Sequence, residues 1–414
     1  MTPLKSSHRC PGCGWTKVSK GWTVSSLPVV MNYRFRTPRE AIRVARRDVS
    51  LVECGRCGLI FNATFDPSVI PYDDRYENRQ CYSESFMRHL EERSEAVHAA
   101  LRLPTRTGRV LEVGCGKGDF LKMVCKKTGR SGIGYDTSYE GPSKALLGAV
   151  EFHTRYVSSA DIKEPLSAIL CRHVVEHIGS IGDFLGELAR MARAGGDPLV
   201  FLETPDFGWI AEQGAFWDVF YEHCNYFSRA ALRDLCDRAG FTVIRHNAVF
   251  VRQYQWIEMR LRRRQKTPTY KRKSSSLLLT FARCQQRQQS RLQKSVAEQA
   301  GPGGWGIWGA GAKGVALCHA LKTPPPRAVI DSNPAKQGSF IPGTSIPGIL
   351  QSRNSTWCAS QILTTKGRSL PPCAEADLRR RFCISRPDET HPRHIEADSG
   401  NPGRRTLASA AALL

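Results

Sequence analysis

A histidine beside a glutamate, inside an aromatic stretch, is the first group in this sequence that could carry out proton-transfer chemistry. The stretch FWDVFYEHCNYFS covers residues 216–228 and contains Glu222 and His223. Histidine titrates near neutral pH, so His223 could act as a general base, with Glu222 orienting its ring. Tyr221 and Tyr226 could donate hydrogen bonds to a carbonyl oxygen that gains negative charge. The same residues could instead form a packing segment with a hydrogen-bonded histidine.

A second pair of this kind, Glu176 and His177, lies in CRHVVEHI, directly after an apolar run at residues 168–171. Ligands of doubly wound sheets bind at the carboxyl ends of the strands, so this pair is placed where a ligand could lie. We therefore expect His177 to contact a substrate and His173 to contact a cofactor. A plain loop and helix start is the alternative.

A glycine-rich turn, Gly114 to Gly118, follows the apolar run at residues 110–113. Glycines let a backbone turn sharply and approach a ligand closely. The turn lacks the Gly-Lys-Ser/Thr ending of a phosphate-binding loop, and the preceding Glu112 suits a ligand with a positively charged amino group. Asp136 ends the next apolar run, where a carboxylate can accept both ribose hydroxyls of a nucleoside, and Asp161 is placed to meet an adenine amino group. The expected contacts are Glu112, Gly114, Cys115, Gly116, Gly118, Asp136, Asp161 and His173.

Two cysteine pairs near the N-terminus have the spacing of a metal site. They are Cys10 with Cys13, in CPGC, and Cys54 with Cys57, in CGRC. A two-residue spacer lets both thiolates of a pair reach one tetrahedral ion, so the four cysteines predict structural zinc, with a redox dithiol as the alternative. Four thiolates leave no open coordination position, so the ion is expected to stabilise a fold and to do no chemistry.

A second glycine turn, GAGAKG at residues 309–314, matches the dinucleotide pattern GxGxxG. It follows an apolar strand and precedes a helix, and Asp331 closes the next strand. Taken alone, the pattern suggests NAD binding. Lys313 and the helix N-terminus could instead meet phosphates of another nucleotide ligand, or the turn could bind nothing. The candidate substrate contacts here are Gly309, Gly311, Lys313 and Asp331.

Short apolar runs alternate with amphipathic stretches around these motifs, which predicts a parallel sheet covered by helices on both faces. The runs lie at residues 110–113, 132–136, 168–171 and 199–204. The predicted fold class is α/β: a Rossmann-like domain, a small N-terminal zinc-binding domain and a second, incomplete C-terminal Rossmann-like unit. The predicted layout is a zinc domain at 1–65, a helical connector at 66–105, the Rossmann-like domain at 106–250, a basic helical linker at 251–300, the C-terminal unit at 301–350 and an irregular, aberrant tail at 351–414.

Composition indicates which partners and which cellular compartment to expect for the protein. The 414 residues carry a formal net charge of +22, which favours phosphate-bearing partners or simply adds solubility and a basic linker. Fifteen cysteines without a signal peptide indicate a reducing compartment. No apolar run approaches the roughly 20 residues that a membrane span needs, so a soluble, cytoplasmic protein without membrane contact is expected. The oligomeric state is left open.

With these motifs in place, residues 109–247 resemble the class I S-adenosylmethionine-dependent methyltransferases, in which the glycine turn wraps the methionine part and the acid after the second strand binds ribose. The cysteine pairs, the EHCNYF segment and GAGAKG with DSNPAKQGSFIPGT further resemble the three-domain sugar C-methyltransferases, over residues 8 to about 349. That resemblance implies His223 as the base that deprotonates a nucleotide-linked keto-sugar, and a C-terminal unit that holds the nucleotide-sugar. The family often has a tyrosine where this sequence has Phe220, which leaves the tyrosine's role open.

Three other functions are consistent with parts of the sequence. An RNA or tRNA methyltransferase would explain the cysteine pairs and the basic run at residues 260–273, but that run lacks the interleaved aromatic residues that stack on bases. Nucleic acid is therefore a partner that we do not favour over a small-molecule substrate. An oxidoreductase would use the second glycine turn, and a binding protein without catalysis would explain the unusual tail.

Overall fold

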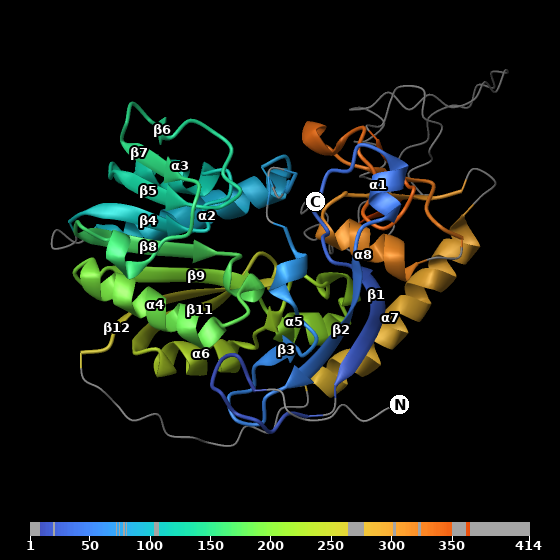
Figure 1. Cartoon of the computed structure of the whole chain (residues 1–414), viewed down its shortest axis with the longest axis horizontal. Coiled ribbons are helices and arrows are strands. Elements are labelled where there is room, and N and C mark those ends of the chain that lie inside the picture. The colour runs from blue at the N-terminus through green and yellow to red at the C-terminus, as the bar shows by residue number, and fades with distance from the viewer. Residues whose placement is uncertain are drawn as a thin grey trace, which may run out of the picture.

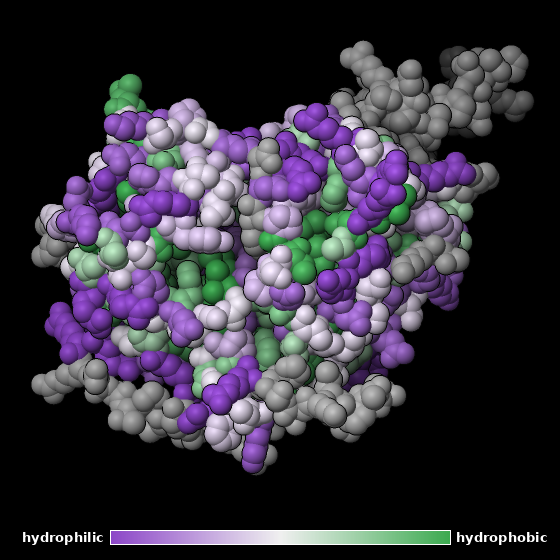
Figure 2. All heavy atoms as spheres, viewed as in Figure 1, coloured by the Kyte–Doolittle hydropathy of each residue, from purple (hydrophilic) through white to green (hydrophobic). Residues whose placement is uncertain are grey.

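The computed structural model describes residues 9–19, 21–71, 73, 75–77, 79, 81–102, 107–263, 277–300, 304–321, 324–349 and 362–364. These residues form three sheets (Figure 1), and polar side chains cover most of the face seen in Figure 2. Among the described residues, no helix combines the length and the apolar character that crossing a bilayer requires. Most of the predicted basic run and of the predicted tail lie outside the described residues.

The central sheet has eight strands in the order β11-β12-β9-β8-β4-β5-β7-β6. Five strands run parallel, and β12, β11 and β6 are antiparallel to their neighbours, so the sheet is mixed where the sequence predicted a parallel one. The strands are β4 (Arg109–Val113), β5 (Gly132–Tyr135), β6 (Lys144–Ala145), β7 (Val150–His153), β8 (Leu166–Arg172), β9 (Leu199–Pro205), β11 (Phe241–Val249) and β12 (Tyr254–Leu261).

Helices cover both faces of this sheet, as predicted. Successive side chains of a strand point to opposite faces, so Val110 of β4 packs in one apolar cluster while Leu111 packs in another. One cluster holds α2 (Glu84–Leu101) and α3 (Asp119–Thr128), and the other holds α4 (Ile181–Ala194) and α6 (Arg229–Arg238). The predicted connector at 66–105 thus contains α2, which covers the sheet, and a short η1 (Pro67–Val69).

The second sheet joins the N-terminal part to a distant segment. Its order is β1-β2-β3-β10, from β1 (Trp22–Pro28), β2 (Arg46–Glu53) and β3 (Ile60–Asn62), with α1 (Pro38–Ile42) between β1 and β2. Its fourth strand, β10 (Asn225–Tyr226), comes from the aromatic stretch at 216–228. The predicted zinc domain is therefore completed by residues of the predicted Rossmann-like domain.

The third sheet lies at the C-terminal side, in the order β15-β14-β13-β16. It consists of β13 (Gly306–Trp308), β14 (Ala328–Ile330), β15 (Gly348–Ile349) and β16 (Ile362–Thr364), with α8 (Ala312–Ala320) after β13 and η5 (Pro334–Lys336) after β14. The strand β16 lies in the segment predicted to be irregular, and its apolar and β-branched residues pair in parallel with β13. The rest of that segment is not described.

Two further boundaries differ from the prediction. The Rossmann-like domain was expected to end at 250, yet β12 continues the central sheet to Leu261. In the predicted linker, α7 (Leu277–Gln299) packs beside α5 (Phe207–Gln213). Figure 1 shows α7 along the edge of the C-terminal unit. The apolar residues of β12 pair with β9, which explains why this basic region contributes a strand.

Candidate functional site

The first glycine turn links β4 to α3. Gly114, Gly116 and Gly118 all have positive φ, at 70°, 53° and 77°. A Cβ added at Gly114 would lie 2.3 Å from Cγ2 of Val174, which is too close for any side chain, so this glycine is required. The turn therefore keeps its backbone amides close to the carboxyl ends of β4 and β5, where Cys115 is buried.

Two carboxylates flank this turn. Asp136 follows β5, and its Oδ2 accepts the Gly116 N–H at 2.8 Å while Oδ1 accepts the Ser138 N–H at 2.7 Å. Glu112 is 2% exposed, and its Oε2 has no hydrogen-bond partner among the described residues. Burial raises the pKa of Glu112 to about 8, although the nearby Arg172 opposes the shift. An unsatisfied buried carboxyl below a glycine turn fits a ligand that brings a positively charged amino group.

The two other predicted cofactor contacts are already engaged. Asp161 ends η2 (Ser159–Asp161), where it accepts the Ser158 N–H at 2.8 Å and pairs with Arg155 at 2.8 Å, and these contacts lower its pKa. His173 follows β8 with a φ of 52°, a conformation that non-glycine residues rarely adopt. Its Nδ1 lies 3.2 Å from Glu176 Oε1, and its buried Nε2 has no hydrogen-bond partner among the described residues.

The second titratable centre is His223, in the loop between η4 (Phe216–Asp218) and β10. Its ring lies 4.0 Å from Phe220 and 4.8 Å from His177, measured between centroids. Burial lowers the pKa of His223 well below its usual value, and the neighbouring His177 adds to the shift. The backbone N–H of His223 donates to the Phe220 carbonyl at 3.2 Å. Burial of the ring thus favours the neutral imidazole, in which one nitrogen keeps a lone pair.

Glu222 does not face His223, although the two are neighbours in the chain. Its Oε2 accepts the Met31 N–H at 2.8 Å, and burial raises its pKa to about 8 against the effects of that N–H and of Tyr76. The contact of Glu222 with the histidines is through its backbone: its carbonyl accepts a hydrogen bond from Nδ1 of His177 at 2.9 Å. The carboxyl group thus connects this loop to the N-terminal sheet.

The two predicted tyrosines are also bound to backbone. The Tyr221 hydroxyl accepts the Asp66 N–H at 2.9 Å and donates to the Thr64 carbonyl at 3.3 Å. The Tyr226 hydroxyl accepts the Phe220 N–H and donates to the carbonyl of the same residue, each at 3.2 Å. These contacts make both hydroxyls part of the scaffold that holds the loop.

Comparisons with known proteins decide the class of the central part. Residues 84–246 match the family described as "Methyltransferase domain". Together with the sheet order and the glycine turn between Glu112 and Asp136, this match settles the identity of the region. Residues 84–246 are a class I S-adenosylmethionine-dependent methyltransferase domain.

Two curated relatives carry the name ubiquinone biosynthesis O-methyltransferase. The protein from Nitrobacter winogradskyi is 33% identical over 97 residues, which cover 21% of this chain and 36% of the relative. The protein from Bradyrhizobium sp. is 29% identical over 110 residues, covering 24% of this chain and 41% of the relative. This chain thus spans less than half the length of these relatives.

Among solved structures, the chain is similar to a 1,6-didemethyltoxoflavin-N1-methyltransferase from Burkholderia thailandensis, determined with S-adenosylhomocysteine. The identity is 18%, the match covers 43% of this chain and 81% of the other, and the TM-score is 0.34. It is also similar to the magnesium protoporphyrin IX methyltransferase from Synechocystis PCC 6803, at 15% identity, 43% and 86% coverage and a TM-score of 0.33.

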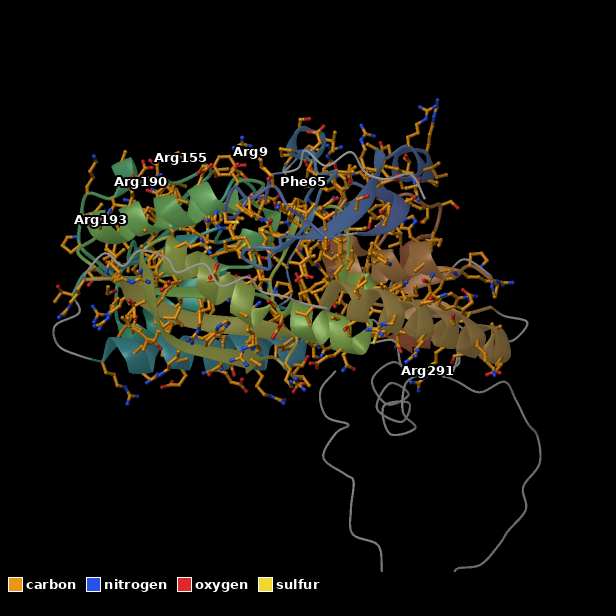
Figure 3. All side chains as sticks on the ribbon, turned by 90° about the horizontal axis from the view of Figure 1, so that it is seen from below. Arg9, Phe65, Arg155, Arg190, Arg193 and Arg291 are labelled. Carbon is orange, nitrogen blue, oxygen red and sulfur yellow. The ribbon has the colours of Figure 1, made fainter. Side chains whose placement is uncertain are left out.

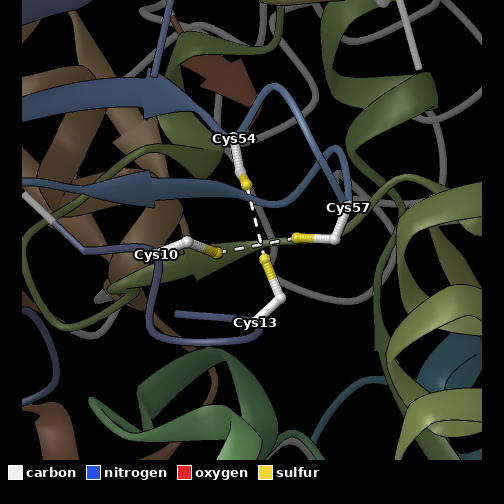
Figure 4. Close-up of side chains that lie close together, drawn as sticks. All are labelled: Cys10, Cys13, Cys54 and Cys57. Carbon is white, nitrogen blue, oxygen red and sulfur yellow. Dashed lines mark hydrogen bonds between the residues drawn. The ribbon is translucent and has the colours of Figure 1, made fainter. Parts of the chain in front are cut away.

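The four cysteines converge beside the methyltransferase domain, as Figure 4 shows. The Sγ atoms of Cys10 and Cys57 lie 3.6 Å apart, as do those of Cys13 and Cys54, and all four lie within 4.8 Å of one another. A tetrahedral zinc ion with Zn–S bonds of about 2.3 Å would separate its sulfurs by roughly 3.8 Å. The cluster can therefore hold zinc, and the structure supports the predicted ligand set.

A second group of potential ligands lies in the methyltransferase domain itself. Glu176, His177 and His223 each offer one ligand atom within 4.8 Å of the others. Oε1 of Glu176 contacts His173 and Oε2 accepts the Thr204 hydroxyl at 3.0 Å, so both oxygens are already engaged. Protein contacts therefore already occupy both oxygens of the carboxylate in this group.

The second glycine turn forms as predicted, but the side chains expected to contact a ligand, Lys313 and Asp331, are bound to other protein groups. Oδ2 of Asp331 accepts the Ala310 N–H at 2.6 Å, which ties the end of β14 to the turn. Lys313 contacts the methyltransferase domain, with Nζ 3.0 Å from Oδ1 of Asp218 and 2.8 Å from Oε1 of Gln253. Gly309 has a φ of 105° and Gly311 caps α8, so both shape the turn.

Sequence reasoning singled out the histidines but missed three of their neighbours in the structure. Asp218 lies inside the aromatic stretch already singled out, so its charge among aromatic residues was an available signal. Tyr254 begins β12 and Gln253 directly precedes that strand, in a region that the sequence assigned to a linker. The Tyr254 ring lies 4.7 Å from that of His173. No local pattern marks these two residues as part of the site.

Proposed function

We propose that this protein transfers a methyl group from S-adenosylmethionine to the carbon beside the keto group of a nucleotide-linked sugar, with His223 as the general base. The observation that carries the proposal is the position of His223, whose ring is buried and lies 4.8 Å from that of His177, and burial lowers the pKa of His223 and so favours its neutral form. A neutral imidazole in a water-poor site can remove a weakly acidic C–H proton.

The cofactor would occupy the turn between Glu112 and Asp136. S-adenosylmethionine would supply an electrophilic methyl group, Glu112 would face its amino group and Asp136 its ribose, with Asp161 and His173 at the adjoining strand ends. On the acceptor, His223 would take the proton from the carbon, and the carbon would use the freed electron pair to bond the methyl group. The sulfur would keep the electrons of the broken bond, and the proton would remain on His223 until product release.

Residues around His223 would serve the acceptor. His177 donates its Nδ1–H to the Glu222 carbonyl of the loop, and its ring lies 4.8 Å from that of His223. Tyr221, Glu222 and Tyr226 would act by holding the loop, since their side chains contact backbone. The glycine turn with Gly309, Gly311 and Asp331 would bind the nucleotide part of the acceptor. The four cysteines would bind a structural zinc ion, which would stabilise the N-terminal sheet.

O-methylation, with a phenol as the acceptor to test, is the second candidate, because the curated relatives are named ubiquinone biosynthesis O-methyltransferase. An RNA acceptor has less support, since two arginines of the methyltransferase surface, Arg155 and Arg190, are paired with carboxylates. Figure 3 labels Arg155, Arg190 and Arg193 along one edge of the molecule. Arg155 pairs with Asp161 and Arg190 with Glu187, at 2.8 Å and 2.6 Å, which reduces the positive field that phosphates would meet.

The test is methyl transfer from labelled S-adenosylmethionine to a panel of nucleotide-linked keto-sugars, phenols and RNA. We expect label on the keto-sugars, and loss of transfer by about 100-fold or more in His223→Ala, the scale of a general base. His98→Ala on α2 is the matched control and is expected to keep full activity. Full turnover by His223→Ala would remove the base assignment, and label on phenols alone would favour the second candidate.

A further inference from the structure

The contact between Lys313 and Asp218 joins two parts of the chain that are far apart in sequence. Lys313 lies in the first turn of α8, directly after the second glycine turn, and α8 packs against η4, which ends at Asp218. The ammonium group lies 3.0 Å from Oδ1 of Asp218 and 2.8 Å from Oε1 of Gln253. The C-terminal unit therefore places a positive charge against the loop that carries His223.

Asp218 depends on this partner. Its side chain is buried, its Oδ2 has no hydrogen-bond partner among the described residues, and the one cation paired with it there is Lys313. A buried carboxylate without a cation is strongly disfavoured, so Asp218 would protonate or move if Lys313 were neutral. Burial raises the pKa of Asp218, while Lys313 opposes that shift.

The loop that follows Asp218 in turn holds His223. Phe220, two residues after Asp218, accepts the His223 backbone N–H at 3.2 Å, and its ring lies 4.0 Å from that of His223, so a shift of η4 would move the histidine ring. The groups that face His223 are His177 and His173 from the methyltransferase domain, Tyr226 from β10 and Lys313 from α8. Lys313 can therefore act on the base both through Asp218 and through its own charge.

We propose that Lys313 is a positioning residue of the acceptor site: it holds Asp218 and thereby fixes the orientation of His223. The C-terminal unit then completes the acceptor site through this lysine, and methyl transfer depends on α8 being docked against η4. The proposal rests on the proposed function for its effect on turnover, but the coupling of Lys313 to His223 is a property of the protein without any acceptor.

The experiment compares the full-length protein with Lys313→Met, Asp218→Asn and the double variant. Lys126→Met, an exposed lysine on α3, is the matched control. The double variant removes both charges together, so it leaves no unpaired buried charge and is expected to fold. Titration of labelled histidine rings by NMR, with His223→Gln to assign the signal, measures the protonation of His223, and calorimetry measures the affinity for S-adenosylmethionine.

We expect Lys313→Met to raise the pKa of His223 and to shift its ring signals, while the affinity for S-adenosylmethionine stays within about twofold. Turnover on a nucleotide-linked keto-sugar is expected to fall on the order of tenfold or more, because small misplacements of a catalytic group are costly. The double variant should be no worse than the worse single variant, since both act on one contact.

An unchanged His223 signal in Lys313→Met, or additive losses in the double variant, would overturn the proposal. Failure of the wild type to methylate keto-sugars is a separate outcome that sinks the proposed function. In that case the histidine titration still decides whether Lys313 positions His223.

Discussion

Loss of the metal from the four-cysteine cluster is expected to free the His223 loop while leaving cofactor binding intact. The perturbation is Cys54→Ser, or removal of the ion by a strong chelator. Cys54 lies between β2 and β3, and β3 pairs with β10, which begins two residues after His223. A structural zinc site supplies about 10 kcal/mol or more to small folds, so its loss should disorder the N-terminal sheet.

The size of the effect follows from the hydrogen bonds between the N-terminal part and the loop. Three of these bonds join Met31 to Glu222 at 2.8 Å, Asn62 to Cys224 at 2.9 Å and Asp66 to Tyr221 at 2.9 Å. Each contributes about 1 kcal/mol net, so their loss removes about 3 kcal/mol from the ordering of the loop. That free energy corresponds to a roughly 100-fold larger population of displaced loop conformations.

Hydrogen exchange of peptides covering residues 216–228 measures this population directly. We expect exchange there to accelerate by about 100-fold in Cys54→Ser, and the affinity for S-adenosylmethionine to change by less than about threefold. The cofactor residues Glu112 and Asp136 make none of the three contacts. Cys81→Ser, a cysteine outside the cluster, is the control. Unchanged exchange in the metal-free protein would refute the reasoning, as would equal loss of cofactor binding.

Three further predictions concern buried polar groups. The affinity for S-adenosylmethionine, measured by calorimetry, should increase by up to about tenfold for each unit of pH increase between pH 6 and 8. The reason is that a cationic ligand favours ionised Glu112, whose pKa is raised to about 8. Glu112→Gln should remove this pH dependence of the affinity. Tyr221→Phe should lower the free energy of unfolding by about 1–2 kcal/mol in urea titrations, since the Asp66 N–H loses its acceptor; an unchanged midpoint would contradict this. Burial raises the pKa of Glu222 to about 8, so its protonated form stabilises the fold, and this stabilisation is lost as the pH rises from about 4.5 to about 8. Over that window the free energy of unfolding of Glu222→Gln should rise relative to the wild type by at most about 1.4 kcal/mol per pH unit. Parallel pH profiles of stability for the two proteins would argue against this.

The cofactor side of the molecule could be predicted from sequence because its signals are local. A continuous apolar run ends at a glycine turn, Glu112 lies in β4 and Asp136 directly follows β5, and the pattern alone defines both positions. The cysteine spacing was equally local. The strands β4, β5, β8 and β9 lie within one or two residues of their predicted bounds.

The acceptor side could not be predicted, because it is assembled from contacts between distant segments. The strand β10 has only two residues and pairs with β3, so no periodicity marks it. Polar and apolar residues do not alternate clearly in β12, and the strand adjoins an arginine-rich stretch, so the sequence did not indicate its place in the sheet. Nothing near Lys313 in the sequence points to Asp218, and the glycine pattern before it suggested a phosphate contact instead.

Glu222 and His223 illustrate why neighbouring titratable residues need not act as a pair. The carboxyl group of Glu222 is bound by Met31 of the N-terminal part, whereas the ring of His223 lies among groups of the methyltransferase domain and Lys313. The two neighbouring side chains therefore lie in different interfaces: Glu222 against the N-terminal part, and His223 against the methyltransferase domain and the C-terminal unit. Because the base is fixed only where these interfaces meet, a methyltransferase domain isolated from its flanking units would keep the cofactor residues and lose the geometry of the base.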